Sequence, residues 1–323
     1  FVVENLQLSI GGSLGLALFP SHSKSSDDLL RMADVAMYVA KGEGLHHCWY
    51  RPELDRHSKR RLSLLAALGP AIDRGELFLV FQPIIDIWNG KLSGFEALTR
   101  WRHPEHGVIP PADFIPFAET SEVIRPLTRW VLANAVRQGA EWRRHGWELK
   151  ISVNISARNL LDEQLGRYVA ECLTAHGFPA GALELEVTES ALMTRQAQAL
   201  EILQSLRATG LNIAIDDFGT GYSSLAYLAR LPVNTLKVDQ SFVRGMQNCK
   251  TNEQIVRSVI SLAHECQLNV VAEGVENEAI FGTLYNMGCD LMQGYLVARP
   301  MEAAAASEWM RTRLPFKIRQ GNG

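Results

Sequence analysis

Apolar runs alternate with amphipathic stretches along most of the chain, from about residue 76 onward. The stretch EQIVRSVISLAHECQ at 253–267 is typical of the helical periodicity found in most of the gaps between the apolar runs. This alternation implies parallel strand pairing with right-handed crossovers. The predicted strands lie at 77–84, 92–101, 149–156, 182–190, 211–217, 235–242, 269–276 and 291–297.

The first gap, DIWNGKL, is too short to hold a crossover helix. We therefore expect the first two strands to form an antiparallel hairpin with Asn89-Gly90 at its turn. Eight strands in about 240 residues suit an α/β fold of the TIM type, a (β/α)8 barrel modified by one antiparallel strand. An open doubly wound sheet is the alternative that the pattern leaves open.

The first fifty residues predict a short α/β unit of their own. An apolar strand at 8–19 ends at Pro20, and a helix capped by Ser25 or Ser26 runs to Gly42. One strand and one helix do not enclose a core, so residues 1–50 are predicted to be the end of a larger domain.

A linking helix is predicted at 51–70, and Gly69-Pro70 should kink or restart it before the barrel at 71–323. The chain opens on Phe1 rather than on a methionine, so we interpret it as a fragment. Any membrane tether of the longer protein is expected upstream.

Charge and composition exclude some classes of function. The 323 residues carry a net charge of −3 with a pI near 6.3, which argues against binding to DNA or RNA polymers but leaves a small anionic ligand open. No apolar run approaches the roughly 18 residues that span a bilayer, so no membrane contact is expected from this chain. The five cysteines contain no C-x-x-C pair and are typical of reduced thiols in the cytoplasm.

Polar side chains occur close to the C-terminal end of nearly every predicted strand. In a barrel of this type those ends meet at one mouth, where catalytic groups lie. A single strand-end carboxylate is usually a cap, but this many in register predict a site. The residues are Glu96, Asn154, Glu186, Asp216, Asp217, Lys237, Glu273 and Gln293.

Five of these side chains are carboxylates and only one is a fixed cation, Lys237. Hard oxygen donors without cysteine or histidine favour Mg²⁺ or Mn²⁺ over structural zinc. The adjacent Asp216 and Asp217 make sense if one carboxylate bridges two ions while its neighbour binds only one. Paired divalent ions are typical of phosphodiester hydrolysis.

Several motifs together resemble an EAL domain, a family that hydrolyses cyclic di-GMP to linear pGpG. The motifs are EALTRW at 96–101, DDFGTGYSSLAYL at 216–228, KVDQSF at 237–242, AEGVE at 272–276 and QGY at 293–295. The first fifty residues resemble the C-terminal end of a GGDEF domain, through GGSLGLALFP and ADVAMYVAK. The signature loop of that cyclase family is absent, so no cyclase activity is expected from this remnant.

The resemblance implies a two-ion site with Mg²⁺ or Mn²⁺, in which Ca²⁺ should inhibit. One ion would be held by Glu96, Asn154, Glu186 and Asp216, and the second by Asp216, Asp217 and Glu273. Glu96, Asp217, Lys237 and Glu273 are thereby expected to be catalytic.

The resemblance also assigns residues around the metal ligands. Lys237 would lie near the attacked phosphate and orient the attacking water, while Gln293 would hydrogen-bond that water or its metal. Gln82 and Arg100 are expected to contact substrate, with Arg100 suited to grip phosphate oxygens. Glu189 would hold the DFGTGYSS loop, through which family members often form homodimers.

Two other functions remain open from the sequence. A catalytically inactive EAL domain would serve as a cyclic di-GMP receptor or interaction module, but such members usually lack a metal ligand and every matched position here is filled. An enolase-like barrel enzyme would need a strand-end base and a single metal cluster, without the paired-aspartate loop. An active phosphodiesterase is therefore the favoured interpretation.

Overall fold

The structure is a computed structural model that describes residues 2–3, 6–7, 12–42, 45–194, 196–220, 225–228 and 230–316. The chain divides into two compact units, Phe1–Pro70 and Ala71–Gly323, and each is treated by itself.

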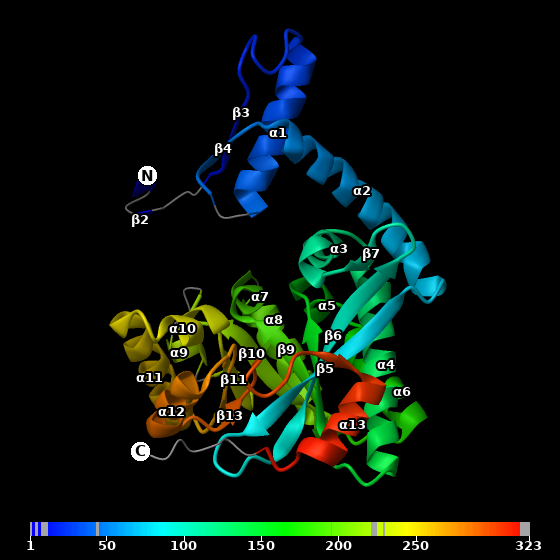
Figure 1. Cartoon of the computed structure of the whole chain (residues 1–323), viewed down its shortest axis with the longest axis vertical. Helices are drawn as coiled ribbons and strands as arrows, with labels where there is room; N and C mark the ends of the chain where they lie inside the picture. The colour runs from blue at the N-terminus through cyan, green and yellow to red at the C-terminus, as the bar shows by residue number, and fades with distance from the viewer. Residues whose placement is uncertain are drawn as a thin grey trace. The chain divides into compact units, whose positions relative to one another are not determined.

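The first unit packs helix α1 against two short parallel strands (Figure 1). Strand β3 (Leu14–Leu16) pairs with β4 (His47–Trp49), and α1 (Ser26–Gly42) lies between them in sequence. Its small core contains Ala36, Val39, Ala40, Cys48 and Tyr50. A separate antiparallel pair is formed by β1 (Val2–Val3) and β2 (Leu6–Gln7).

The helix expected up to Gly42 is confirmed, but the strand expected at 8–19 is too long. Within the described residues that strand covers only 14–16, while residues 8–11 lie outside the described part of the chain. A turn explains the early end, because the His22 amide donates to the Leu18 carbonyl at 2.8 Å and the Leu18 amide donates to His22 Nδ1 at 2.9 Å.

The linking helix is longer than expected, and the predicted restart at Gly69-Pro70 is wrong. Helix α2 (Pro52–Asp73) continues through Pro70, although proline removes one backbone donor. Leu64, Leu68 and Ala71 are each at most 1% exposed and recur at helical spacing, so one buried apolar face extends past the proline.

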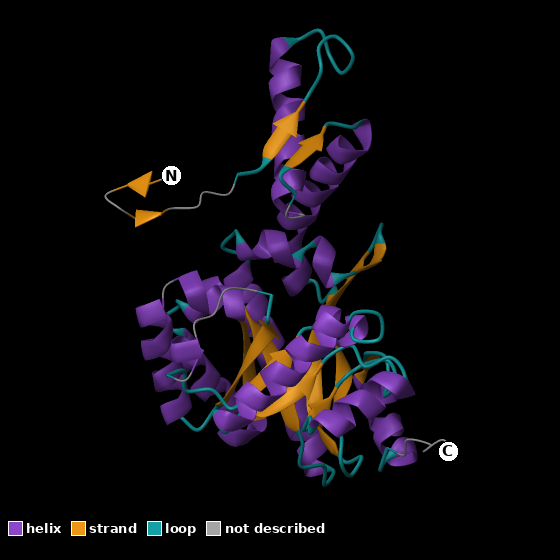
Figure 2. Ribbon diagram, turned by 90° about the vertical axis from the view of Figure 1, so that its left-hand side faces the viewer, coloured by secondary structure: helices purple, strands orange, loops and turns teal. Residues whose placement is uncertain are grey.

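The second unit is a closed barrel of eight strands surrounded by helices (Figures 1 and 2). Around the barrel the order is β5, β13, β12, β11, β10, β9, β8 and β6, and β6 pairs back with β5. The strands are β5 (Leu77–Asp86), β6 (Leu92–His103), β8 (Lys150–Ile155), β9 (Leu183–Thr188), β10 (Asn212–Phe218), β11 (Thr235–Val238), β12 (Asn269–Ala272) and β13 (Leu291–Met292).

Only β5 runs against its barrel neighbours, since it is antiparallel to both β6 and β13 while the other neighbouring pairs are parallel. The modified (β/α)8 barrel is thereby confirmed, and the open sheet is wrong. The expected hairpin turn is also present, because the Gly90 amide donates to the Asp86 carbonyl at 3.0 Å and Gly90 has a φ of 69°. Two further strands, β7 (Gly107–Ile109) and β14 (Met301–Glu302), extend the sheet beside β6 and β5 and were not predicted.

Three of the predicted strands end four or five residues earlier than expected. Strand β11 stops at Val238 because the Asp239 side chain accepts from the Ser241 amide at 2.9 Å and caps helix α10 (Gln240–Gly245). Strand β12 stops at Ala272, just before Gly274 with a φ of 70°. Strand β13 covers only 291–292 because a turn follows at Gly294.

Helices connect and cover the barrel strands. The longer ones are α4 (Ile124–Arg144), α6 (Leu165–His176), α8 (Gln196–Ala208), α11 (Lys250–Glu265), α12 (Glu278–Met287) and α13 (Ala303–Arg313). The shorter ones include α3 (Ile115–Glu119), α5 (Ala157–Leu160), α7 (Glu189–Thr194) and α9 (Leu225–Leu228), with the 3₁₀ turns η1 (Pro111–Asp113) and η2 (Ala180–Ala182).

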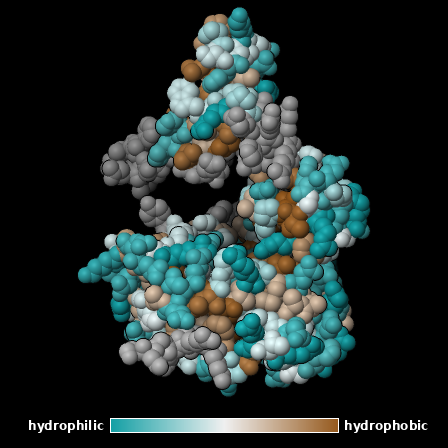
Figure 3. Space-filling model, viewed as in Figure 1, coloured by the Kyte–Doolittle hydropathy of each residue, from teal (hydrophilic) through white to brown (hydrophobic). Residues whose placement is uncertain are grey.

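Aromatic packing fixes α4 against the antiparallel hairpin. The ring of Trp142 lies 4.9 Å from those of both Phe81 and Phe95, measured between centroids, and all three side chains are at most 2% exposed. On the face shown in Figure 3, hydrophilic residues cover most of the barrel unit and hydrophobic ones gather in smaller patches. Among the described residues, no helix combines the length and apolar character that crossing a bilayer requires.

Candidate active site

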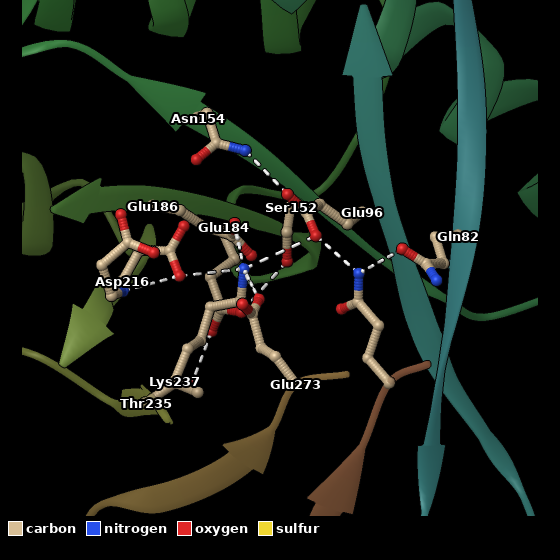
Figure 4. Close-up of polar contacts among 12 residues, drawn as sticks. Gln82, Glu96, Ser152, Asn154, Glu184, Glu186, Asp216, Thr235, Lys237 and Glu273 are labelled. Carbon is tan, nitrogen blue, oxygen red and sulfur yellow. Dashed lines mark hydrogen bonds and ion pairs between the residues drawn. The ribbon is translucent and has the colours of Figure 1, made fainter. Parts of the chain in front are cut away.

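The predicted strand-end residues converge on the buried ammonium of Lys237 (Figure 4). Its side chain is 1% exposed, and four carboxylates from four other barrel segments surround it. The distances from Nζ are 2.6 Å to Glu186 Oε2, 2.7 Å to Glu273 Oε1, 3.3 Å to Asp216 Oδ1 and 3.5 Å to Glu96 Oε2. One lysine therefore lies at the centre of a group of four carboxylates that come from four separate parts of the barrel.

The surrounding acids control the protonation of Lys237. Burial opposes its charge, but the nearby carboxylates, with Asp216 and Glu186 foremost, hold the pKa of Lys237 well above its usual value. Burial likewise opposes ionisation of Glu96, yet Lys237 and hydrogen bonds from Gln293 and Asn154 hold the pKa of Glu96 below its usual range. Both groups are thus charged at neutral pH.

Burial and the neighbouring acids raise the pKa values of three other carboxyl groups, so these groups resist ionisation without added cations. Burial raises the pKa of Glu186 well above its usual value, and it raises that of Glu273 to about 8. Burial, together with Asp216 and Asp239, raises the pKa of Asp217 to about 6. The excess of carboxylates is what a site for additional cations requires.

Asp216 and Asp217 are neighbours in strand β10, and their backbone explains how both reach the same site. Successive strand residues normally point to opposite faces of a sheet. Asp217, however, has a φ of 54°, and the pairing of β10 with β11 shifts register between Ile215 and Phe218. As a result, single oxygens of Asp216, Asp217 and Glu273 all lie within 4.8 Å of one another.

The donor set fits a hard divalent cation. Carboxylate and amide oxygens dominate the site, and these are the ligands that Mg²⁺ and Mn²⁺ prefer. Two buried oxygens, Glu186 Oε1 and Gln293 Oε1, have no hydrogen-bond partner in the described structure. Buried polar atoms are normally paired, so these oxygens are available as acceptors for a bound ion or its water.

An amide network joins the hairpin to the cluster. Gln293 Nε2 donates to Glu96 Oε2 at 2.6 Å and to Gln82 Oε1 at 3.0 Å, and Gln82 Nε2 donates to the Ala298 carbonyl at 3.3 Å. The side-chain nitrogen Nδ2 of Asn154 donates to Glu96 Oε1 at 2.8 Å, so this hydrogen bond does not use the side-chain oxygen of Asn154. Gln82, Asn154 and Gln293 therefore all lie at the site, as predicted from the sequence.

Arg100 contacts the backbone of its own strand. Its Nη1 donates to the carbonyl of Thr99 at 2.8 Å, and burial lowers the pKa of its guanidinium. Arg100 lies on β6, four residues after Glu96. Its expected contact with substrate stays a prediction.

Two pockets flank the acidic cluster. The larger, with a volume of about 350 Å³, lies between β6, α3 and α4 and is lined mainly by apolar side chains, with Glu119, Asp216 and Asp217 among its polar ones. The smaller, of about 170 Å³, is lined by Arg244 and Tyr295 together with Glu96, Glu273 and Gln293. Asp216 and Leu98 line both pockets, so the cluster lies where they meet.

The loop after strand β10 is attached to the site by Glu189, which is 2% exposed at the start of α7. Its Oε2 accepts from the Gly219 amide at 3.0 Å. Gly219 has a φ of 102°, and an added Cβ would lie 3.0 Å from the ring of Phe242, so glycine is required there. The rest of the predicted loop, residues 221–224, lies outside the described residues.

Replacing Glu189 with alanine is expected to lower turnover by about ten- to a hundredfold, because the backbone that carries Asp217 loses its support. Steady-state kinetics of the purified chain would measure this, with the exposed Glu201→Ala on α8 as the matched control. Equal turnover of the two variants would contradict a role for Glu189 in holding the loop.

A second polar layer, not predicted from the sequence, lies beneath the site. Ser152, Glu184 and Thr235 are at most 5% exposed and form a hydrogen-bonded group in the barrel interior. Each lies two positions before a predicted site residue, namely Asn154, Glu186 and Lys237. A spacing of two residues places side chains on the same face of a strand, and this spacing is the sequence signal that could have identified the second layer.

The fold and site define a barrel protein with a carboxylate-rich centre of the metal-binding type. The family model for the EAL domain matches residues 65–300, and the chain belongs to the EAL-domain family.

Curated relatives agree with this family. The chain is 40% identical over 315 residues to the cyclic di-GMP phosphodiesterase PdeR of Escherichia coli, covering 97% of this chain and 48% of PdeR. It is 39% identical over 305 residues to the bifunctional diguanylate cyclase/cyclic di-GMP phosphodiesterase MucR of Pseudomonas aeruginosa, covering 94% and 44%. The chain thus spans about half the length of these relatives.

Solved structures show the same fold. The PaMucR phosphodiesterase in complex with c-di-GMP is 42% identical with a TM-score of 0.74, over 76% of this chain and 99% of that chain. The FimX EAL domain of Pseudomonas aeruginosa bound to c-di-GMP is 28% identical with a TM-score of 0.68, over 74% and 96%.

Metal binding is expected to displace protons from the cluster, so metal affinity should rise with pH. The raised pKa values of Asp217, about 6, and Glu273, about 8, mean that the folded metal-free protein binds more protons than the unfolded chain. Their contribution to stability is therefore present at low pH and lost as pH rises from about 4 to about 8. A bound cation requires both groups ionised.

Calorimetric titration with Mn²⁺ between about pH 6 and pH 8 should show tighter binding at the higher pH, with proton release detected by comparing buffers of different ionisation enthalpy. The Asp217→Asn variant should release fewer protons. An affinity independent of pH over this range would contradict the assignment of Asp217 and Glu273 as ligands.

Proposed function

We propose that this chain hydrolyses cyclic di-GMP to linear pGpG with two divalent ions, Mg²⁺ or Mn²⁺. The observation that carries the proposal is the group of carboxylates around buried Lys237, with Asp216, Asp217 and Glu273 arranged as a cation site. PdeR and the PaMucR phosphodiesterase, both at least 40% identical, support the choice of reaction and substrate.

The two flanking pockets support a substrate with two nucleoside halves. A cyclic dinucleotide placed over Asp216 would put one base in the larger apolar pocket and the other beside Tyr295. The phosphodiester between them would then face the carboxylate cluster. Arg299 already lies over the Tyr295 ring at 4.3 Å from its centroid, which holds that ring as a stacking surface for a base.

The proposed metal ligands divide into two sets that share Asp216. Glu96, Asn154, Glu186 and Asp216 would hold one ion, and Asp216, Asp217 and Glu273 the other. When bound, such ions act as Lewis acids that activate water and neutralise phosphate charge.

The remaining residues have roles of their own. The Lys237 ammonium would stabilise charge that develops on the attacked phosphate and orient the attacking water. Gln293, whose Oε1 has no partner, would accept a hydrogen bond from that water. Gln82, next to Gln293, and Arg100 are proposed to contact the substrate.

Further parts of the proposal concern ions, assembly and location. Ca²⁺ should occupy the site but support turnover poorly, because its looser coordination leaves the water less well placed.

Homodimerisation is proposed through the loop after Asp217. Residues 1–50 are proposed to be the end of a GGDEF domain, in keeping with the alignment to bifunctional MucR. All five cysteines are free thiols, which supports a cytoplasmic location.

The test is to incubate the purified chain with cyclic di-GMP and Mg²⁺ or Mn²⁺ and to separate the nucleotides by chromatography. Formation of pGpG that is abolished by EDTA and by Glu96→Ala is the expected result. Tight binding of cyclic di-GMP without product would instead support a receptor.

A further inference from the structure

The barrel interior contains a buried acid that the proposed reaction does not use. Glu184 on strand β9 is 5% exposed, and both of its carboxylate oxygens accept hydroxyl hydrogen bonds (Figure 4). Ser152 Oγ on β8 donates to Oε1 at 3.1 Å, and Thr235 Oγ1 on β11 donates to Oε2 at 2.8 Å. The group therefore joins three strands across the inside of the barrel.

Each member of this group lies directly below a site residue on its own strand. Ser152 precedes Asn154, Glu184 precedes Glu186, and Thr235 precedes Lys237, always by two positions, so each pair points to the same interior face. The strands β8 and β9 also place these residues opposite each other in register, Ser152 with Glu184 and Asn154 with Glu186. The hydrogen bonds among Ser152, Glu184 and Thr235 thus fix how β8, β9 and β11 are aligned along the barrel axis. The same three strands carry the site residues Asn154, Glu186 and Lys237.

Packing alone is a poor explanation for an acid at this position. Glu184 forms no ion pair with any residue that the structure describes, although burying an unpaired carboxylate costs free energy. Replacing both partners of a buried hydrogen bond by apolar groups of the same shape can be nearly neutral for stability. A role in supporting the metal site above it explains the Glu184 carboxylate better than a role in core packing does.

We propose that Glu184 is a positioning residue for the metal site, acting through Ser152 and Thr235. By bridging β8 and β11 it fixes the distance between Glu186 and Lys237, whose 2.6 Å contact is the shortest in the cluster. This inference rests on the proposed metal-dependent function, and residues that orient metal ligands typically contribute about ten- to a hundredfold to metal affinity.

The test measures Mn²⁺ binding to the full chain by calorimetry without nucleotide, followed by steady-state kinetics. Glu184→Gln keeps the shape but provides only one acceptor oxygen, so one of the two hydroxyls loses its acceptor. We expect the dissociation constant for Mn²⁺ to rise by about ten- to a hundredfold and kcat to fall, with KM nearly unchanged. Wild-type Mn²⁺ affinity and kcat in Glu184→Gln would overturn the proposal.

A matched control separates positioning from general loss of stability. Ser307→Ala removes a half-buried hydroxyl, the acceptor for Trp142 Nε1 at 2.8 Å between α4 and α13. This variant is expected to melt at a lower temperature but to keep wild-type Mn²⁺ affinity. An equal loss of Mn²⁺ affinity in Ser307→Ala would also overturn the proposal, because any weakening of the barrel would then suffice.

A second pair of variants decides the matter if Glu184→Gln does not fold. Thr235→Val removes the hydroxyl and keeps the shape, while Thr235→Ser restores a hydroxyl. Weaker Mn²⁺ binding in Thr235→Val with recovery in Thr235→Ser supports positioning, and equal affinities refute it. If the wild-type chain hydrolyses cyclic di-GMP while these variants bind Mn²⁺ normally, only this inference fails; if the wild-type chain binds no Mn²⁺, the proposed function fails with it.

Discussion

Asp216→Asn is expected to lower hydrolysis of cyclic di-GMP by about a thousandfold or more. Asp216 lines both pockets and contacts Lys237 at 3.3 Å, and one of its oxygens lies within 4.8 Å of oxygens from Asp217 and Glu273. Asparagine keeps the size of the side chain but removes its charge. It also offers an NH₂ group where a cation needs an oxygen, so both proposed metal positions are weakened together.

The measurement is product formation over a range of Mn²⁺ concentrations, together with Mn²⁺ binding by calorimetry. Glu253→Gln removes an acid of the α11 surface that pairs with Arg257 at 3.1 Å, and it should leave both quantities unchanged. Full turnover by Asp216→Asn would rule out a bridging role for this residue. Loss of one Mn²⁺ site with the other retained would place Asp216 on a single ion.

Lys237→Met is expected to abolish turnover and to destabilise the metal-free protein by about 3–5 kcal/mol, the usual cost of removing one partner from a buried ion pair. Four carboxylates within 3.5 Å of Nζ would lose the ammonium that they surround. The loss of stability should shrink at lower pH, because Glu273, with a pKa of about 8, and Glu186 then become protonated. It should also shrink when Mn²⁺ is added, because bound cations replace the missing charge.

Urea unfolding in EDTA and in Mn²⁺ would measure both effects, with the exposed Lys91→Met on the hairpin as the matched control. A loss of stability that is the same in EDTA and in Mn²⁺ would show that charge compensation is not what Lys237 provides. Retained turnover would remove Lys237 from the group that acts on the phosphate.

Much of the fold was predictable because its signals are local. The DIWNGKL gap alone required an antiparallel hairpin, and that reversed strand, β5, is where the barrel departs from the parallel pattern. Strand ends were less predictable, because they depend on contacts that sequence periodicity does not contain. Asp239, for example, belongs to an apolar run but caps α10 instead of continuing β11.

The sequence by itself determined which residues form the site, because closing a parallel barrel necessarily brings the C-terminal ends of its strands to one mouth. This is why Gln293 and Glu96 were both predicted at that mouth although 197 positions separate them. Only the tertiary structure decided how the charges are arranged. The left-handed backbone of Asp217 and the register shift beside it turn two adjacent acids to one side, and burial of Lys237 among four carboxylates sets their protonation. The hydrogen bonds of Glu184 also depend on the tertiary structure, since its partners lie 32 and 51 residues away and meet it only inside the closed barrel.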